Sequence, residues 1–531
     1  MKLLRRRPKP GSYSAAAGSA HGHKPRKLRH NLRLGLVVLV LPLNALAMAV
    51  WLINGNLSSA KQLQTEGKRA VAADLEKLEL RSERQFAYYQ VRPWQTPASL
   101  AQHFGVTAEE LAALNPGPIL PGMTIKIPPV RQPLTETVVT PLSPANVEVV
   151  EEAGAVHVRG KASLPLTITT IPELANYLTS TQVLSQTAPR RWLLLKPLVL
   201  EGNIRLNVTG QTLDLLELRS QPHNIVCLCL EDAQMLIKNV TIRSLDPASG
   251  QVDSNFDDER SYIRARRSSR LDIIGADISY LGNNDRADDK DIQRGGGTAG
   301  VSWRIPDDGR GVEVATGWVE GSRLHHNYVG AYSFGANGMV WRGNQLTDNI
   351  TSGLSLRGDS AGSLIEDNLL QGNGKHGLEL VRGARNNQLY RNRALANRQH
   401  GYSVTEESQF NLLEANQATG NASSLVISQS HYNAVRGNRF EEAVAANVRV
   451  ERQSRVNLLV GNSLRGGSKG FELSSGASFI LIKGNTVAAS LAVAADRVNS
   501  LILIDNQVSK RNFRLRNNTN TVIGPTRITR S

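Results

Sequence analysis

Short apolar segments alternate with polar residues through most of the chain after residue 148. Gly377-Leu378-Glu379-Leu380-Val381 is one such segment, and Gly or Asn ends many of them. Alternation with a period of two predicts β-strands, and Gly and Asn are typical of the turns between strands. The clearest amphipathic helical run in this region is Pro172 to Leu184. The pattern therefore predicts a mainly β domain over residues 148–531.

The turn residues of this region recur at a nearly constant spacing. Three residue ladders follow it: Asn344, Asn368, Asn392, Asn416, Asn438, Asn462, Asn485 and Asn506; Asn349, Asn373, Asn397 and Asn421; Gly353, Gly377 and Gly401. A fixed period indicates one repeated unit stacked along an axis. About 24 residues fit one coil of a right-handed parallel β-helix, with strands ~4.8 Å apart. Asn tolerates the left-handed turn conformation, and we expect its side-chain amide to bond to the Asn one coil away. We expect each Gly to mark a turn where φ must be positive.

The chain before the β domain has a different pattern. Residues 54–87 are rich in Lys, Glu, Gln, Ala and Leu and predict a stalk helix. Residues 88–129 predict a small α+β unit, with helices at Ser99 to Thr107 and Ala108 to Asn115 and a closing strand at Gly122 to Ile127. Residues 130–147 contain several Pro and predict a semi-extended linker.

The formal net charge of +16 comes largely from one segment. Residues 1–33 contain ten Lys or Arg and no acidic residue, and the 20 residues from Leu34 to Ile53 carry no charge. Such a span is long enough to cross a bilayer, and basic flanks stay cytoplasmic. The sequence therefore predicts a single-pass inner-membrane anchor at 34–53, with a cytoplasmic segment at 1–33 and a periplasmic C-terminal domain. It disfavours nucleic-acid binding. The alternative is a signal peptide cleaved after Ala45-Leu46-Ala47.

The chain has two Cys residues, which excludes a disulfide scaffold and a Cys-based zinc domain. Cys227 and Cys229 are two residues apart, so a strand would point both thiols to one face. We interpret them as small core residues with no redox or metal role.

Charged and titratable side chains concentrate on three consecutive coils of the predicted β-helix. His376 and His400 share a register and should lie nearly above one another. Cations beside a groove suit a uronate polymer, whose carboxylate needs neutralising before the adjacent carbon can lose a proton. Alternatively, one basic side chain per coil simply decorates an exposed sheet. The candidate residues are Arg357, Asp359, Lys375, His376, Arg382 and His400.

An acidic loop offers oxygen ligands that calcium prefers. Its carboxylates are Asp285, Asp288, Asp289 and Asp291, with Asp307 and Asp308 nearby. Because Gly295-Gly296-Gly297 follows closely, a solvated insertion loop is the favoured interpretation, and we expect no other cofactor.

Residues 88–129 resemble a LysM module over its whole length. The resemblance rests on the order of apolar positions, the Leu114-Asn115 pair and the closing Gly122-Met123-Thr124-Ile125-Lys126-Ile127-Pro128. It implies binding to glycans that contain N-acetylglucosamine, commonly peptidoglycan. Thr96-Pro97-Ala98-Ser99-Leu100 replaces the usual Gly-Asp-Thr-Leu, so a spacer that has kept the fold and lost the sugar is the alternative.

Residues 316–440 resemble the periplasmic mannuronan C5-epimerases of alginate-producing bacteria. The similarity rests on the segments Thr316 to Ser322, Asn327 to Tyr332, Trp341 to Asn344, Lys375-His376-Gly377 and Tyr390 to Arg393. Those β-helical enzymes invert C5 of mannuronate within the polymer. The resemblance implies that Arg382 neutralises a substrate carboxylate, and that an exopolysaccharide secretion complex is a possible partner.

One catalytic motif of that family is missing. Where the family has Asp-Pro-His-Asp, with His as the proposed base, this chain has Ser355-Leu356-Arg357-Gly358. Arg stays protonated near neutral pH and is a poor general base. Three interpretations remain open: His376 abstracts the proton, Arg357 acts as in uronate lyases, or the site binds without reacting. The sequence thus predicts a C5-epimerase-like protein, a polyuronate lyase or a non-catalytic polysaccharide-binding scaffold.

Overall fold

The computed structural model of the chain describes residues 86–161, 166–221, 225–258, 260–284, 298–306, 312–509 and 512–528. The predicted cytoplasmic segment, membrane anchor and nearly all of the stalk lie outside these ranges, as do the six Asp residues considered for calcium. None of the helices within these ranges combines the length and apolar character needed to span a bilayer.

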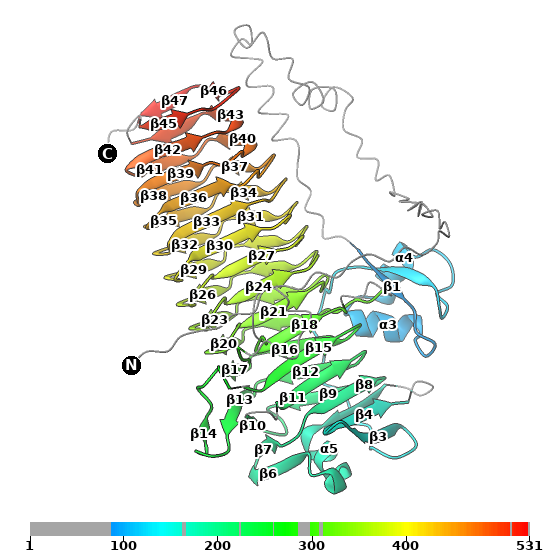
Figure 1. Ribbon diagram of the computed structural model, residues 1–531. Coiled ribbons are helices and arrows are strands. Elements are labelled where there is room, and N and C mark those ends of the chain that lie inside the picture. The colour runs from blue at the N-terminus through cyan, green and yellow to red at the C-terminus, as the bar shows by residue number, and fades with distance from the viewer. Residues whose placement is uncertain are drawn as a thin grey trace, which may run out of the picture. The chain divides into compact units, whose positions relative to one another are not determined.

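Three long sheets make up most of the described chain (Figure 1). Sheet 1 has 15 strands, sheet 2 has 14 strands and sheet 3 has 16 strands. The strands of sheet 1 are β3 Val147–Glu152, β4 Ala155–Gly160, β8 Leu198–Gly202, β11 Cys227–Glu231, β15 Tyr262–Arg266, β18 Val301–Arg304, β21 Ala331–Phe334, β24 Leu354–Arg357, β27 Leu378–Val381, β30 His400–Thr405, β33 Ser423–Ser428, β36 Ala446–Glu451, β39 Lys469–Leu473, β42 Leu491–Asp496 and β45 Phe513–Arg516.

The strands of sheet 2 are β5 Thr167–Thr170, β9 Ile204–Thr209, β12 Gln234–Lys238, β16 Arg270–Ile274, β19 Trp318–Glu320, β22 Val340–Arg342, β25 Leu364–Glu366, β28 Gln388–Tyr390, β31 Leu412–Glu414, β34 Ala434–Arg436, β37 Leu458–Val460, β40 Ser478–Lys483, β43 Asn499–Ile504 and β46 Val522–Ile523. The strands of sheet 3 are β6 Leu184–Ala188, β7 Arg191–Leu194, β10 Leu215–Arg219, β13 Thr241–Asp246, β14 Gln251–Val252, β17 Asp277–Ser279, β20 Arg323–His325, β23 Gln345–Thr347, β26 Leu369–Gln371, β29 Arg393–Leu395, β32 Gln417–Thr419, β35 Arg439–Glu441, β38 Ser463–Arg465, β41 Thr486–Ala488, β44 Asn506–Val508 and β47 Thr526–Ile528.

Successive coils contribute one strand to each sheet, and neighbouring coils pair in parallel, as between β24 and β27. This confirms the predicted parallel β-helix. Among the described strands of the three sheets, the antiparallel pairs are β3 with β4, β6 with β7, and β13 with β14. The predicted helix at Pro172 to Leu184 is shorter than expected: α5 covers Ile171–Tyr177, and a 3-10 turn follows at Thr179–Thr181.

The core is the interior of the solenoid, filled by one side chain from alternate positions of each strand. It consists largely of Leu, Ile, Val and Ala, which pack as layers with a residue above and below in the next coil. Trp303 and Trp341 meet edge to face with their ring centroids 5.1 Å apart. Tyr402 is fully buried, and its hydroxyl donates to the backbone carbonyls of Asn392 and Gln417.

The Asn ladders hold the corners together as predicted. The backbone N–H and side-chain Nδ2 of Asn344 both donate to Oδ1 of Asn368, at 2.9 Å each. The same pattern joins Asn349 to Asn373. A third Asn ladder, in addition to the two Asn ladders and the Gly ladder found in the sequence, lies between sheets 1 and 2. It contains Asn387, Asn411, Asn433 and Asn457.

The conformational reason given for these residues was wrong. The ladder Asn residues do not have positive φ; the residue before each one does, as in Asp348 with φ 54° and Asp367 with φ 58°. Gly377 of the Gly ladder does not adopt positive φ either. A Cβ on Gly377 would lie 2.7 Å from the backbone oxygen of Gly401, so Gly is required there by the close approach of the next coil.

Residues 86–129 form a small unit in the order strand, helix, helix, strand. Its elements are β1 Ala87–Gln90, α3 Pro97–Phe104, α4 Ala108–Leu114 and β2 Thr124–Ile127, and β1 pairs antiparallel with β2. Ala87 therefore begins a strand and does not end the stalk helix. Thr96 and Thr107 cap the two helices through capping boxes.

The unit and the residues after it pack against sheet 2. Arg270 and Asp272 form a fully buried ion pair at 2.7 Å, and Arg270 also donates to the backbone carbonyl of His103. Asp272 accepts from the backbone N–H of Leu134 at 2.7 Å. The segment predicted to be a semi-extended, Pro-rich linker is fixed to the β-helix at Leu134, where its backbone N–H satisfies a buried carboxylate.

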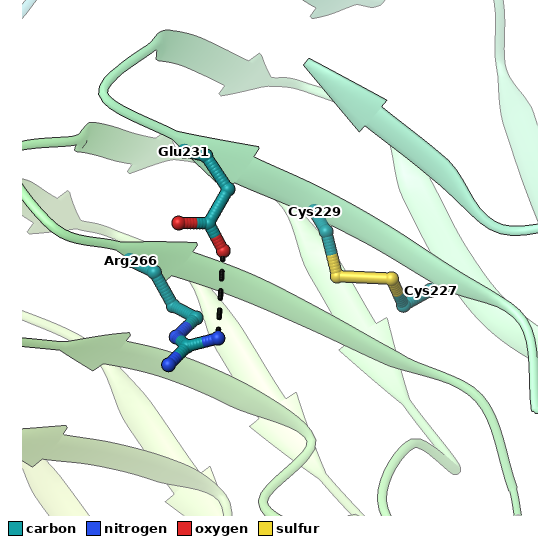
Figure 2. Close-up of a disulfide and its surroundings, with 4 residues drawn as sticks. All are labelled: Cys227, Cys229, Glu231 and Arg266. Atoms are coloured by element: carbon teal, nitrogen blue, oxygen red, sulfur yellow. Dashed lines mark ion pairs between the residues drawn. A yellow bond between two sulfur atoms is a disulfide. The ribbon is translucent and has the colours of Figure 1, made fainter. Parts of the chain in front are cut away.

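Cys227 and Cys229 are both buried and point to the same face of β11, as predicted. They are joined in a disulfide, however, which the interpretation as two separate core thiols did not include (Figure 2). Residues i and i+2 of a strand lie on one side, so the pair that was predicted to share a face is also close enough to bond.

Candidate functional site

The predicted site residues gather on the outer face of sheet 1. In β24, β27 and β30 the alternate residues Leu356, Leu380 and Val404 point into the core. Their neighbours therefore point outward, and the register places Ser355, Glu379 and Ser403 in one row. Arg357, Val381 and Thr405 occupy the next row. The two rows form an outward surface on which neighbouring coils carry different side chains.

Arg357 and Glu379 form the centre of this surface. Arg357 Nη2 lies 3.1 Å from Glu379 Oε1, and Arg357 Nε donates to Ser355 Oγ at 3.1 Å. The Glu379 side chain is only 7% exposed. A carboxylate removed from water to this extent needs a cation beside it, and Arg357 supplies that charge.

His376 lies on the other side of the same carboxylate. Its Nε2 is 3.9 Å from Glu379 Oε2, beyond hydrogen-bond distance. Its ring stacks on His400, with centroids 5.0 Å apart and planes 21° apart. This confirms that the two His residues lie above one another. The buried Nδ1 atoms of both rings have no hydrogen-bond partner in the part of the chain that the structure describes.

The electrostatics keep Glu379 charged and His376 neutral. Burial would raise the pKa of Glu379, but the charge of Arg357 above all outweighs it, and the pKa is lowered to about 2. Burial lowers the pKa of His376 to about 4, although Glu379 acts in the opposite direction. His400 also has its pKa lowered to about 4, mainly by burial. At neutral pH the cluster thus holds a guanidinium, a carboxylate and two neutral imidazoles.

The remaining predicted residues lie near this cluster but outside it. Arg382 follows β27 with φ 55°, and its Nε is 3.4 Å from Glu406 Oε2. Asp359 follows β24, is largely exposed and pairs with Arg385. Lys375 precedes His376 and acts electrostatically on both His376 and Glu379. The structure therefore brings Arg357, His376 and His400 together, and leaves Arg382 and Asp359 in the adjoining turns.

Glu379 is the residue that sequence reasoning missed. It lies within the quoted strand Gly377-Leu378-Glu379-Leu380-Val381, where its alternation marked it only as an outward side chain. Its partner Arg357 is one coil away, with Val381 at the equivalent position, so the contact is diagonal. The sequence signal that could have identified Glu379 is a charged residue at an outward strand position, two residues after the Lys-His-Gly motif.

The two coils before β24 carry aromatic and cationic side chains on the same face. The guanidinium of Arg304 lies over the ring of Tyr332, 4.7 Å from its centroid. Phe334 lies opposite Arg357 in the register. All three of Arg304, Tyr332 and Phe334 are less than one-tenth exposed. This stretch of the outer face is therefore covered in the folded chain.

Within the described ranges, no group of three or more His, Cys, Asp or Glu is placed to hold a metal ion. The acidic loop considered for calcium lies outside those ranges, so the calcium expectation stays a prediction.

Residues 304–440 match the family model described as a right-handed β-helix region. No curated protein sequence matches the chain. Among solved structures, the fold is similar to that of the periplasmic alginate epimerase AlgG, with 16% identity, a TM-score of 0.54, and coverage of 85% of this chain and 96% of that one. A single-substitution mutant of AlgG matches with 17% identity, a TM-score of 0.56, and coverage of 70% and 85%.

These comparisons support the resemblance found in the sequence and the predicted right-handedness of the solenoid. At such identities the likeness shows the fold. What the site does must be argued from its own side chains.

Proposed function

We propose that the outer face of sheet 1 at β24, β27 and β30 binds an acidic, uronate-containing polysaccharide. The observation that carries this proposal is the buried cluster of Arg357, Glu379 and His376. Such a cluster costs desolvation energy, and the fold does not require it, because Val381 and Ser403 occupy equivalent positions on neighbouring coils. Charges kept at a cost on an outer face are typical of a functional site.

The cations around the cluster suit a polymer that carries one carboxylate per sugar. Arg357 uses one side of its guanidinium on Glu379 and Ser355. Lys375 and Arg382 stand on the next coil, and Glu406, the partner of Arg382, is more than half exposed and easily displaced. A substrate carboxylate that replaces Glu406 would accept a charge-assisted hydrogen bond from Arg382. Similarity to the fold of an alginate epimerase supports a polyuronate as the ligand.

The finer proposal is C5 proton abstraction by His376, as in a mannuronan C5-epimerase. A general base must be unprotonated, and the pKa of about 4 keeps His376 neutral near pH 7. Its buried Nδ1 carries a lone pair or proton that none of the described residues uses. Arg357 suits the role of base less well, because the charge of Glu379 outweighs burial and raises its pKa. Arg357 and Arg382 would stabilise the negative charge that develops on the substrate carboxylate.

A non-catalytic scaffold is the second candidate, and the Arg357–Glu379 contact favours it. The guanidinium replaces the His that the epimerase family uses as base, and Glu379 already neutralises it. Such a site can hold a polymer without moving a proton.

Exchange of H5 into deuterated water separates these candidates. The full chain is incubated with polymannuronate in deuterated water, and NMR of the polymer follows loss of the H5 signal. An epimerase exchanges H5 in the parent and not in His376→Ala, whereas a scaffold exchanges in neither and still binds. Formation of an unsaturated product would instead assign a lyase. Absence of polymer binding by the parent would contradict the proposed function itself.

The other parts of the chain fit an envelope protein. We propose a single-pass inner-membrane anchor at 34–53 with the β-helix in the periplasm, on the strength of the ten basic residues before an uncharged span. The order of β1, α3, α4 and β2 supports a LysM-like module that binds peptidoglycan. An exopolysaccharide secretion complex is a compatible partner. A periplasm-specific reporter fused after Ser531 tests the orientation.

A further inference from the structure

A cavity of about 610 Å³ lies on the outer face of sheet 1, well before the Arg357 cluster. Strands β4, β8, β11 and β15 contribute its floor, and Trp94 from the loop between β1 and α3 contributes to its wall. The cavity is therefore built jointly by the first coils of the β-helix and the small N-terminal unit. Cavities of this size are typical of ligand sites.

Four Arg side chains and three carboxylates line the cavity, and one of these carboxylates, Asp232, pairs with Arg92 outside the lining. Arg159 Nε pairs with Glu201 at 2.6 Å, and His157 contacts the same carboxylate. Glu231 is shared between Arg267 at 3.1 Å and Arg266 at 3.7 Å. Figure 2 shows Arg266 of β15 reaching toward Glu231 of β11.

Arg264 is the Arg of this cavity that makes no direct ion pair among the described residues. Its charge acts on Glu231 from a distance, whereas Arg266 and Arg267 lie within ion-pair distance of that carboxylate. The side chain rests on the ring of Tyr262, with 5.2 Å to the centroid, and its buried Nε has no hydrogen-bond partner. The residue as a whole is only half-buried, and a guanidinium without a direct ion pair is a candidate partner for an anionic ligand. An anionic oxygen is the best acceptor for a guanidinium.

Apolar surface stands beside these charges. Trp94, Val199 and Cys229 of the disulfide all line the cavity. Figure 2 shows the disulfide lying on β11 next to Glu231. An aromatic face combined with forked guanidinium donors fits a sugar ring that has one flat C–H face and one carboxylate. It fits a neutral glycan less well, because Arg264 would stay unpaired.

This cavity is separate from the Arg357 cluster. Three strand pairings lead from β15 to β24, a distance of about 14 Å along the solenoid at ~4.8 Å per coil. Arg304 and Phe334 lie between them in the same row and are buried. A ligand can therefore bind in the cavity without contacting the Arg357 cluster, and a ligand at the cluster need not contact the cavity.

We propose that this cavity is a second binding site for a uronate saccharide, in which Arg264 takes the carboxylate and Trp94 stacks on the sugar ring. The choice of uronate rests on the function proposed above. The existence of a separate anionic-sugar site does not, because it follows from Arg264, Trp94 and the cavity alone.

The test is calorimetric titration of the full chain with a short mannuronate oligosaccharide. We expect two sites per parent chain. Arg264→Ala should lose one of them or weaken it about tenfold or more, and Trp94→Ala should do the same while Trp94→Phe retains binding. Quenching of Trp94 fluorescence, absent in Trp94→Phe, reports on the cavity directly. Arg439→Ala removes an exposed Arg on sheet 3 and serves as the matched control, with no change in binding.

The outcomes separate the two proposals. If Arg357→Ala removes one site and Arg264→Ala removes the other, both stand. If Arg264→Ala and Trp94→Ala leave the binding unchanged, the cavity proposal is overturned and the proposed function stands. If only the cavity variants reduce binding, the Arg357 cluster is not a uronate site. Binding in the cavity of an N-acetylglucosamine oligosaccharide that mannuronate does not displace would also overturn the proposal. Arg264→Gln, which keeps the bulk of the side chain, replaces Arg264→Ala if the latter does not fold.

Discussion

The corner ladders and the outer face of sheet 1 are both built of polar side chains that recur once per coil, yet they differ in one respect. At a corner the same residue type repeats, as in Asn368, Asn392 and Asn416, and each amide bonds to the next. On the outer face, equivalent positions carry Ser355, Glu379 and Ser403. The repeated Asn side chains form hydrogen bonds with backbone groups at every coil. On the outer face, the residue type changes from coil to coil, so a particular side chain such as Glu379 occurs at one coil only.

The difference teaches how to separate structure from function in a solenoid. A ladder residue is explained by the coils above and below it, so its contribution is to stability. A residue that interrupts the repeat has no such explanation, and Glu379 and Arg357 are of that kind.

Asn392→Ala should have the largest effect on stability. Asn392 Nδ2 donates to Ile365 O and Asn416 Oδ1, and its Oδ1 accepts from the backbone N–H and Nδ2 of Asn368. Loss of the amide leaves several buried groups unpaired, which should lower the free energy of unfolding by about 4 kcal/mol. Denaturant unfolding followed by circular dichroism measures it. Gln417→Ala, at an exposed position beside the ladder, is the control, and equal stability of the two variants would contradict the role of the ladder.

The outer-face cluster should make stability depend on pH. The pKa of His376 in the folded chain, about 4, is below its ordinary value of 6.5, so the unfolded chain binds a proton first as the pH falls. The stability contributed by neutral His376 is therefore complete above pH 6.5 and is lost as the pH falls toward 4, by on the order of 3 kcal/mol.

His376→Gln removes one of the two imidazoles that titrate in this window and should reduce this part of the pH dependence, while His400 retains its own contribution. Glu379 has a depressed pKa, so its contribution is complete above its ordinary value of 4.5 and is lost only as the pH falls toward about 2. The two windows overlap only between about pH 4.5 and 4. An unchanged pH dependence in His376→Gln between pH 6.5 and 4 would show that His376 is not the buried neutral group described.

Arg382→Ala should weaken polymannuronate binding by about fivefold, with no change in stability. The effect is modest because Arg382 is nearly one-third exposed and contacts an exposed carboxylate of Glu406. Calorimetric titration measures it, with Arg391→Ala as a control for loss of an exposed, ion-paired Arg on a ladder turn. Stronger weakening by Arg391→Ala than by Arg382→Ala would place the polymer on a different face.

Reduction of the disulfide should have the smallest effect. Cys227 and Cys229 are two residues apart, so the bond closes a minimal loop and restricts the unfolded chain little. We expect a loss of about 1 kcal/mol or less, smaller than that from one ladder Asn. Thermal melts with and without reductant measure it, and a Cys227→Ser, Cys229→Ser double variant should not respond to reductant. Unfolding of the chain on reduction would contradict the expectation that the disulfide contributes less stability than one ladder Asn.

The solenoid could be predicted from sequence because its signal is periodic. Two Asn ladders gave the coil length, and the same period placed His376 above His400. The third ladder was missed even though Asn387 and Asn411 keep the spacing of 24. The Gly ladder was found but misread, because the space above Gly377 depends on the next coil and not on the local chain.

The site was only partly predictable for a related reason. Arg357 and His376 were found through motif order, but their common partner Glu379 depends on a diagonal contact between coils. Likewise, the cavity beside Arg264 depends on Trp94, which lies far away in the sequence and arrives there only because the N-terminal unit packs against the β-helix. Contacts of this kind follow from tertiary packing, which local patterns do not encode.

The affinity of polymannuronate for two variants, Arg357→Ala and Asn392→Ala, tests the central claim most directly. Arg357 interrupts the repeat on the outer face, and Asn392 belongs to a ladder. The account predicts that the folded fraction of Asn392→Ala binds as the parent does, while Arg357→Ala binds about tenfold more weakly. Full binding by Arg357→Ala, or loss of binding in folded Asn392→Ala, would contradict it.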